Sequence, residues 1–258
     1  MKKVLRSFFL IINYKTLIIT VLALISTYVC FQLNLTARFP DMLVGVAIVF
    51  PVVFSISSAY TRRETALQRL SDFKGHAIAI YYAMRDWTTD KQNDLPEQAR
   101  VLVNDLTRLM RDMFTKHHRH EWEKNEREIF ERFSQLSALT MEMRNYGVQS
   151  GEISRLSQYV SKMIIAFDNL KIIHAYRTPI TLRAYSKVFI YIFPIIYGPY
   201  FAATADDFSH GLEYVMPILY SFILVSLDNI QDHLEHPFDE VGEDDIRIDE
   251  QDMVAVMK

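Results

Sequence analysis

Four long apolar segments, arranged as two close pairs, constrain this chain more than any other feature. They occupy residues 17–31, 42–56, 188–203 and 212–227. Each is slightly shorter than the roughly 20 residues that a helix needs to cross a bilayer, and flanking residues of a continuing helix can supply the difference. Four such runs in two pairs are unusual in a soluble core. We therefore predict four transmembrane helices in two hairpins, with a soluble protein of buried core helices as the alternative.

Basic residues around these segments predict their orientation. The short connections 32–41 and 204–211 contain only one of them, Arg38, whereas the other ends of the segments are flanked by Lys2, Lys3, Arg6, Arg62, Arg63, Arg177, Arg183 and Lys187. Because basic loops stay in the cytoplasm, both termini and the long middle segment are expected there. The basic, apolar start resembles a signal peptide but lacks a small-residue cleavage site, so we expect a retained span in a bacterial inner membrane.

The middle of the chain is helical by its periodicity. Apolar side chains recur at helical spacing in stretches 67–81, 102–113, 129–143 and 153–167, and residues 147–151 interrupt the pattern between the last two. We expect an all-α membrane protein whose first cytosolic helix continues from the second span. Its predicted parts are the first two spans (1–60), a cytosolic helical domain (61–186), the third and fourth spans (187–230) and an acidic cytosolic tail (231–258).

Composition and motifs argue against enzymatic and nucleic-acid functions. The net charge is −3, and no basic stripe with interleaved aromatic residues occurs. The chain contains neither a glycine-rich phosphate loop nor a nucleophile elbow. Cys30 is the single cysteine, so an intrachain disulfide cannot form. We predict that the protein is not an enzyme and does not bind nucleic acid.

A histidine-rich stretch, KHHRHEWEKNE at 116–126, is the most conspicuous polar cluster. His117 and Glu121 are four residues apart and could share a helix face with a metal ion. The stretch also contains His118 and His120, and it lacks a second apolar shell. We therefore interpret it as a polar, pH-sensitive linker between two amphipathic helices, with metal binding as the alternative.

The C-terminal stretch 228–252 is strongly acidic. A solvated tail is the usual interpretation of such a run. However, apolar residues interrupt it, which predicts that it packs against another surface; they are Leu234, Pro237, Phe238, Ile246 and Ile248. Carboxylates are also the ligands that hard cations prefer, so Glu243, Asp244 and Asp245 are candidates for a cation site.

The second apolar segment contains an unusual pattern around a proline. Phe50 and Phe54 are four residues apart, on either side of Pro51, and successive i, i+4 positions share one helix face. These rings either fill a protein core, face lipid or line a path through the membrane. Pro51 removes one backbone donor, which a membrane tolerates only where protein or water satisfies the released carbonyl.

Three stretches of the chain resemble the bestrophin family of membrane channels, in particular its prokaryotic branch. They are SSAYTRRETALQRL at 57–70, RTPITLRAYSKVFIYIFP at 177–194 and LEHPFDEVGEDD at 234–245. The order of two spans, helical domain, two spans and cytosolic tail is also that of the family. Residues 87–150 match poorly, and their interpretation depends on periodicity.

The resemblance implies a pentameric ion channel whose pore is lined by the second span of each subunit. Its hydrophobic neck would consist of Val46, Phe50 and Phe54, with Pro51 as a local hinge. The same face is expected to continue to Arg62, where the pore would widen. Such a neck can gate small monovalent ions by dewetting. Aromatic edges favour chloride or other anions, although the family includes members of both selectivities.

Calcium-activated animal members hold calcium with the acidic run after their Pro-Phe motif, to which Glu243, Asp244 and Asp245 correspond. The residues around this run depart from the family pattern, so we expect no cofactor and no calcium gating. We expect instead that Phe238 and the isoleucines wrap around a neighbouring subunit. The expected partners are further copies of the chain, small inorganic ions and lipid. The alternative function is a non-conducting membrane scaffold or signalling protein that acts through its cytosolic helices.

Overall fold

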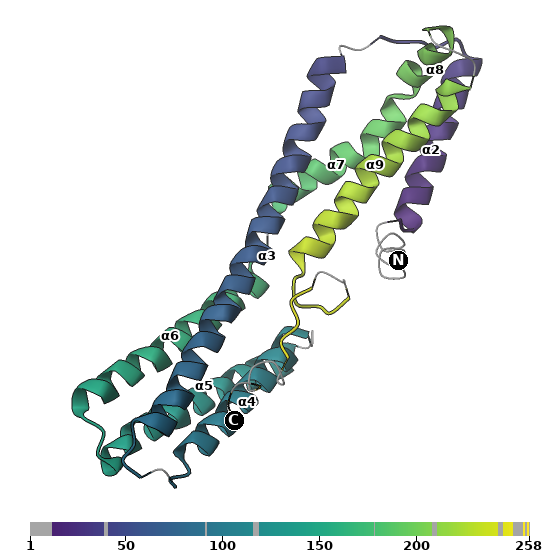
Figure 1. The fold of residues 1–258 in the computed structure, drawn as a ribbon. Helices are drawn as coiled ribbons and strands as arrows, with labels where there is room; N and C mark the ends of the chain where they lie inside the picture. Colours follow the sequence, from purple (N-terminus) through teal and green to yellow (C-terminus); the bar gives the residue numbers. More distant parts are fainter. Residues whose placement is uncertain are drawn as a thin grey trace. The chain divides into compact units, whose positions relative to one another are not determined.

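The computed structural model describes most of the chain, and the described part is helical. No strand occurs within it (Figure 1), which agrees with the predicted all-α class. The described residues are 12–38, 41–90, 92–115, 119–177, 179–207, 211–241, 245–249, 255 and 257. Within the helices, the side chains of residues 41–49, 119, 204–207 and 212 lie outside this description.

The chain divides into two compact units. The first contains residues 1–63, 177–236 and 242–244, and the second contains 64–176, 237–241 and 245–258. The elements are α2 (Tyr14–Gln32), α3 (Asp41–Asp86), α4 (Leu95–Thr115), α5 (Arg119–Glu142), the 3₁₀ helix η1 (Met143–Tyr146), α6 (Ser150–Ala175), α7 (Ile180–Ile196), α8 (Gly198–Asp207) and α9 (Leu212–Glu235).

Three stretches of the first unit are helical, long and apolar enough to cross a membrane: Tyr14–Gln32, Ile180–Ala203 and Glu213–Glu235. They coincide with three of the four predicted spans. The remaining span, 42–56, is helical in α3, but it includes side chains that are not described and stays a prediction. Large apolar side chains on the outer faces of these helices are exposed, as expected for contact with lipid; examples are Leu17, Ile18, Ile25, Ile192, Ile218, Leu219 and Ile223.

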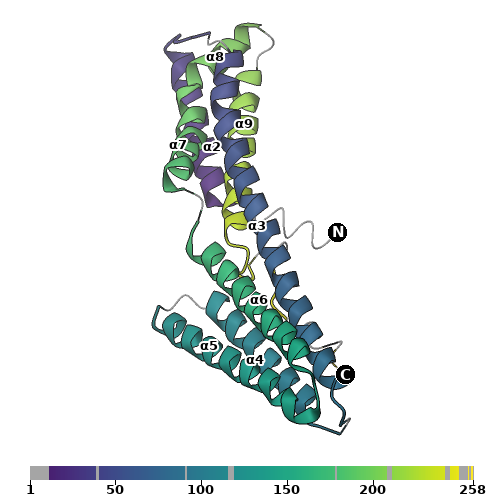
Figure 2. The same ribbon diagram turned by 90° about the vertical axis from the view of Figure 1, so that its left-hand side faces the viewer.

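The start of α2 is capped and tied to a neighbouring helix by one side chain. The side chain of Asn13 accepts hydrogen bonds from the backbone N–H groups of Lys15 (3.0 Å) and Thr16 (3.4 Å), which caps the helix. Its amide nitrogen donates to Asn229 of α9 at 2.8 Å. α2 therefore packs alongside α7, α8 and α9 in one bundle (Figure 2).

The third predicted span consists of two helices. The helix is interrupted between the end of α7 at Ile196 and the start of α8 at Gly198. Ser26 of α2 donates a hydrogen bond to the carbonyl of Ile195 at 2.7 Å, just before the interruption. A Cβ atom added to Gly198 would overlap the Ser26 hydroxyl and lie 3.0 Å from its carbonyl carbon. Glycine at this position is what permits the backbones of α2 and α8 to approach so closely.

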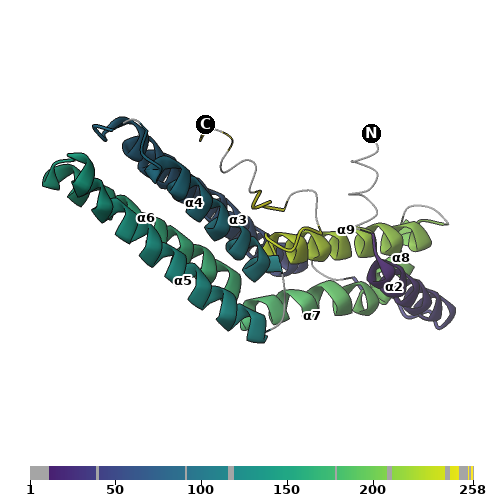
Figure 3. The ribbon, with the colours of Figure 1, turned by 90° about the horizontal axis from the view of Figure 1, so that it is seen from below.

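The second unit encloses the larger hydrophobic core. The α3 residues that belong to this unit pack with α4, α5 and α6 (Figure 3). Phe133 of α5 lies at its centre, with ring centroids 6.4 Å from Phe73 of α3 and 6.1 Å from Phe167 of α6. The predicted apolar stripes are confirmed, since most of their side chains are buried in this core. Each fully buried aromatic or aliphatic side chain contributes about 1.5–3 kcal/mol.

The C-terminal tail supplies part of this core. Phe238 is 2% exposed and stacks on Phe114 of α4 with a centroid distance of 5.1 Å. Ile246 and Ile248 are also buried, and the Ile246 N–H donates to the Pro237 carbonyl at 2.7 Å. The expectation that these anchors wrap around a neighbouring subunit is therefore wrong. They bury their apolar surface in the core of their own chain, where Phe238 contacts Phe114.

The histidine-rich stretch is also different from its prediction. His117 and His118 lie outside the described residues, so the proposed pairing of His117 with Glu121 remains a prediction. From Arg119 onward the stretch is the first turns of α5, and not a linker. The helix is held there by Trp122, which packs against the core and stacks on His174 at 5.0 Å. Among the described residues, no group of three side chains is arranged to hold a metal ion.

Candidate functional site

The aromatic pair of the predicted neck lies on the surface of its own chain. Phe50 and Phe54 are 61% and 54% exposed, although both are large apolar side chains. Their rings meet edge to face with centroids 4.7 Å apart. The third predicted neck residue, Val46, is helical in α3, but its side chain lies outside the described residues. The neck as a set of three therefore stays a prediction.

The opposite face of the same helix segment is packed inside the subunit. Val52, Ser55 and Ala59 are at most 1% exposed. Val52 forms a small core with Ile190 of α7 and with residues of α9. α3 thus has one face that its own subunit covers and one that presents aromatic rings outward. Rings exposed in this way need lipid, another copy of the chain or a conduction path beside them.

Pro51 lies inside α3 without ending it. Its own carbonyl accepts a hydrogen bond of 3.4 Å from the hydroxyl of Ser186 on α7. This bond ties α3 to α7 beside the proline, but the carbonyl that Pro51 leaves without its helical N–H partner is that of Ala47, four residues earlier. A hinge role for Pro51 stays a prediction.

The outward face of α3 does not continue unchanged to Arg62. Four residues of an α-helix turn by about 400°, so each i, i+4 step drifts by about 40°. Ser58 is still exposed, but Arg62 is partly buried. Burial lowers the pKa of the Arg62 guanidinium, Glu235 raises it, and Arg177 lowers it further. This change of direction turns Arg62 toward its own subunit. It corrects our expectation that Arg62 lies on the same helix face as Phe50 and Phe54.

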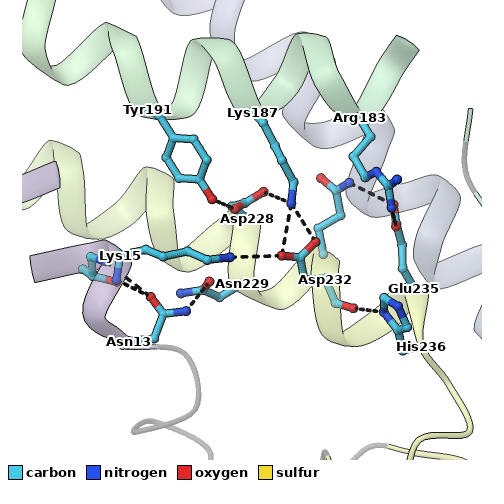
Figure 4. Close-up of polar contacts among 12 residues, drawn as sticks. Asn13, Lys15, Arg183, Lys187, Tyr191, Asp228, Asn229, Asp232, Glu235 and His236 are labelled. Atoms are coloured by element: carbon cyan, nitrogen blue, oxygen red, sulfur yellow. Dashed lines mark hydrogen bonds and ion pairs between the residues drawn. The ribbon is translucent and has the colours of Figure 1, made fainter. Parts of the chain in front are cut away.

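A polar network in the first unit was missed by the sequence analysis (Figure 4). Lys187 of α7 lies 3.1 Å from one Asp232 carboxylate oxygen and 4.0 Å from Asp228, while Lys15 of α2 lies 3.6 Å from Asp232. The Tyr191 hydroxyl donates a short hydrogen bond to Asp228, whose side chain is fully buried. Side chains from three helices thus meet around two carboxylates of α9.

Glu235, at the end of α9, forms a second part of this network. Its carboxylate is fully buried and accepts a hydrogen bond from Arg183 of α7 at 3.1 Å. The other carboxylate oxygen accepts from the Gln231 amide, also at 3.1 Å. A buried carboxylate needs such partners, because an unpaired charge in a low-dielectric interior is costly.

The signal for this network was present in the residue spacing. Arg183, Lys187 and Tyr191 recur every four residues and therefore share one face of α7. The acids of α9 recur at helical spacing as well, but the predicted fourth apolar segment ends at residue 227, and the prediction assigns the acids after it to a tail. α9 continues to Glu235, so this part of the acidic stretch is helical and paired.

The predicted cation site cannot be assembled from the described residues. Glu243 and Asp244 lie outside them, and Asp245 lies inside. Nearby, Glu240 is engaged by Arg111 of α4 through two hydrogen bonds of 2.9 and 3.1 Å. A cation site at Glu243, Asp244 and Asp245 therefore stays an alternative to the expectation that the protein binds no calcium.

The long apolar helices and the all-helical architecture define an integral membrane protein. No protein-family model and no curated protein sequence matches the chain. Solved structures do match it. A tryptophan-to-alanine variant of a bacterial bestrophin homologue from Klebsiella pneumoniae aligns with a TM-score of 0.75 and 14% identity, over 100% of this chain and 98% of that one.

Two further structures of bestrophin homologues from the same organism agree. A tyrosine-to-alanine variant gives a TM-score of 0.73 at 13% identity, over 98% of this chain and 99% of that one. A structure obtained by zinc phasing gives 0.73 at 14% identity, over 95% and 97%. The chain therefore has the fold of bacterial bestrophin homologues along nearly its whole length, and the resemblance inferred from its motifs is confirmed at the level of the fold.

Proposed function

We propose that this protein is a passive ion channel, formed by a pentamer of the chain around a shared axis. Its hydrophobic neck is lined by α3 and consists of Val46, Phe50 and Phe54 from each subunit. The neck passes small monovalent ions, chloride or other anions in particular. The fold shared with bestrophin homologues and the motif resemblance to that channel family support this proposal.

The observation that carries the proposal is the two-faced character of α3. Phe50 and Phe54 are exposed, while Val52 and Ser55, on the opposite face of the same helix, are buried. One helix per subunit cannot enclose a water path, so a pore lined by this face requires a ring of copies. A ring of such aromatic side chains can close the path by dewetting, and the positive edges of the rings favour anions.

The network in the first unit supports the proposed topology. Asp232, near the end of α9, pairs with both Lys15 at the start of α2 and Lys187 of α7. These parts of the three helices therefore share one end of the bundle, as two membrane hairpins require. We propose that this end of the bundle and both termini lie on the cytoplasmic side of a bacterial inner membrane, because basic residues flank the predicted spans there.

Planar-bilayer recording of the purified protein, with reversal potentials measured in ion gradients, tests conduction and selectivity together. We expect current in the unmodified protein and a changed conductance or open probability in Phe50→Ala and Phe54→Ala. Leu219→Ala is the matched control, because Leu219 is 50% exposed on α9 and is expected to contact lipid. Its current should remain that of the unmodified protein.

Three outcomes would count against the proposal. A correctly assembled oligomer that passes no current under any ionic condition would favour the non-conducting scaffold. A monomer or dimer with Phe50 and Phe54 in lipid would exclude a shared pore. Equal effects of Leu219→Ala and Phe54→Ala would show that the neck residues act only through packing.

A further inference from the structure

The outward face of α3 can be followed beyond the aromatic pair. α3 is one helix from Asp41 to Asp86. Four exposed polar residues come after Phe54 at alternating steps of three and four residues: Ser57, Thr61, Glu64 and Gln68. At about 100° per residue, each of them lies within about 40° of Phe50 around the helix axis. Together with the two rings they form one stripe, which we call the outward stripe of α3.

Residues on the opposite side of α3 are buried along the same length of helix. Val52, Ala59 and Ala66 are at most 1% exposed. Each lies about 160–200° from Phe50 around the helix axis. Val52 packs in the smaller core, with Ile190, and Ala66 packs in the larger one. Apolar packing on this side therefore holds the outward stripe away from the subunit over its whole length.

The outward stripe changes from aromatic to polar after Phe54. Steps of three and four residues are also the spacing of a coiled-coil seam, but such a seam is held together by apolar side chains. The four polar residues cannot supply one, so copies of α3 would not pack tightly along this part of the helix. Side chains that neither their own subunit nor a neighbouring copy covers stay in water. In a ring of copies, they therefore line a wet continuation of the path that the rings of Phe50 and Phe54 close.

Glu64 is the charged member of the outward stripe. It lies ten residues after Phe54, which is about 15 Å along the helix axis. At physiological ionic strength a charge in water is screened over about 8 Å, so Glu64 acts on ions that approach the neck and not on the rings themselves. Acidic rings on an ion path attract cations and repel anions. The Glu64 carboxylates therefore oppose the preference for anions that the edges of the aromatic rings provide.

We propose that Glu64 is a specificity-determining residue of the channel, which lines the wet part of the ion path and lowers the permeability to chloride relative to potassium. This inference rests on the proposed channel function and names the residue that limits its preference for anions. Glu64→Gln changes the charge on the path by one unit in every subunit, whatever other contacts the side chain makes.

Reversal potentials of the purified full-length protein in a potassium chloride gradient, recorded in planar bilayers, give the ratio of chloride to potassium permeability. We expect Glu64→Gln to raise this ratio by about threefold or more and Glu64→Lys to raise it further, whereas Glu64→Asp should retain the original value. At about 1 M salt the effect of Glu64→Gln should shrink, because the screening length falls to about 3 Å. Glu131→Gln is the matched control, since it removes the same charge from an exposed position on α5 and should leave the ratio unchanged.

Charged reagents separate the effect of the charge from an effect on folding. Glu64→Cys is prepared in a Cys30→Ser protein and treated with a negatively or a positively charged methanethiosulfonate, which reacts with the thiol. The negative adduct should lower the ratio of chloride to potassium permeability, and the positive adduct should raise it. The same ratio in all Glu64 variants, or an equal shift in Glu131→Gln, would overturn the role of Glu64 and leave the channel intact. The absence of current from every correctly assembled variant would instead refute the channel function, and this role with it.

Discussion

The anchoring of the tail in its own subunit makes a quantitative prediction. Phe238 is 2% exposed and contacts Phe114, and the core around it also receives Ile246 and Ile248. Replacing a buried phenylalanine by alanine costs about 3–5 kcal/mol, because apolar burial is lost and a cavity remains. Phe238→Ala should therefore raise the population of detached tail by about two to nearly four orders of magnitude.

Hydrogen exchange is the assay that reports this detachment locally. The Ile246 N–H is bonded to the Pro237 carbonyl, so its protection depends on the tail remaining in place. We expect that protection to fall steeply in Phe238→Ala while protection in α5 changes less. Val241→Ala is the control, because Val241 is 55% exposed in the same segment and its truncation should cost less than about 0.5 kcal/mol.

Two results would contradict this reasoning. Unchanged protection of Ile246 in Phe238→Ala would show that the buried ring does not hold the tail. Protection that disappears when the oligomer is dissociated, with each subunit still folded, would show that a neighbouring subunit holds it, as the sequence alone had suggested.

Three further predictions concern other parts of the chain. Gly198→Leu should lower the thermal midpoint of the purified protein strongly, because its side chain has no space against α2; Gly211→Leu, at an open but positive-φ position, should cost only the backbone strain. Tyr191→Phe should destabilise the protein by about 1–3 kcal/mol in denaturant titrations, since it removes a partner of the buried Asp228, and a neutral effect would show that water replaces the hydroxyl. Burial lowers the pKa of His76, so its contribution is present above about pH 6.5 and is lost as the pH falls through the lowered folded-state pKa. His76→Phe should therefore flatten the acid side of the stability profile, and an unchanged profile would assign that side to other groups.

The sequence predicted the helices well because their signals are local. Apolar periodicity placed Phe73, Phe133 and Phe167 in the core, where they meet. The runs of apolar residues predicted four spans, and three of them coincide with described helices long and apolar enough to cross a membrane. Both signals depend on residues that are close in the chain, and a single helix already expresses them.

The polar network could not be predicted in the same way, because it is assembled from distant parts of the chain. Tyr191 and Asp228 are 37 residues apart, and Arg183 and Glu235 are 52 apart. Their spacing on each helix indicated a polar face, but only helix packing decides which two faces meet. The acids after the fourth apolar segment were therefore assigned to a cytosolic tail, whereas Asp228, Asp232 and Glu235 are in fact helical and paired.

The sequence by itself determined that this is a helical membrane protein, and its motifs identified the fold that it shares with bestrophin homologues. Only the tertiary structure decided which side of each helix is covered. It showed that Phe50 and Phe54 face outward, that Arg62 turns inward and that Phe238 is buried in its own chain. The physical reason is that hydrophobicity specifies that a side chain leaves water, whereas packing against specific neighbours specifies where it goes.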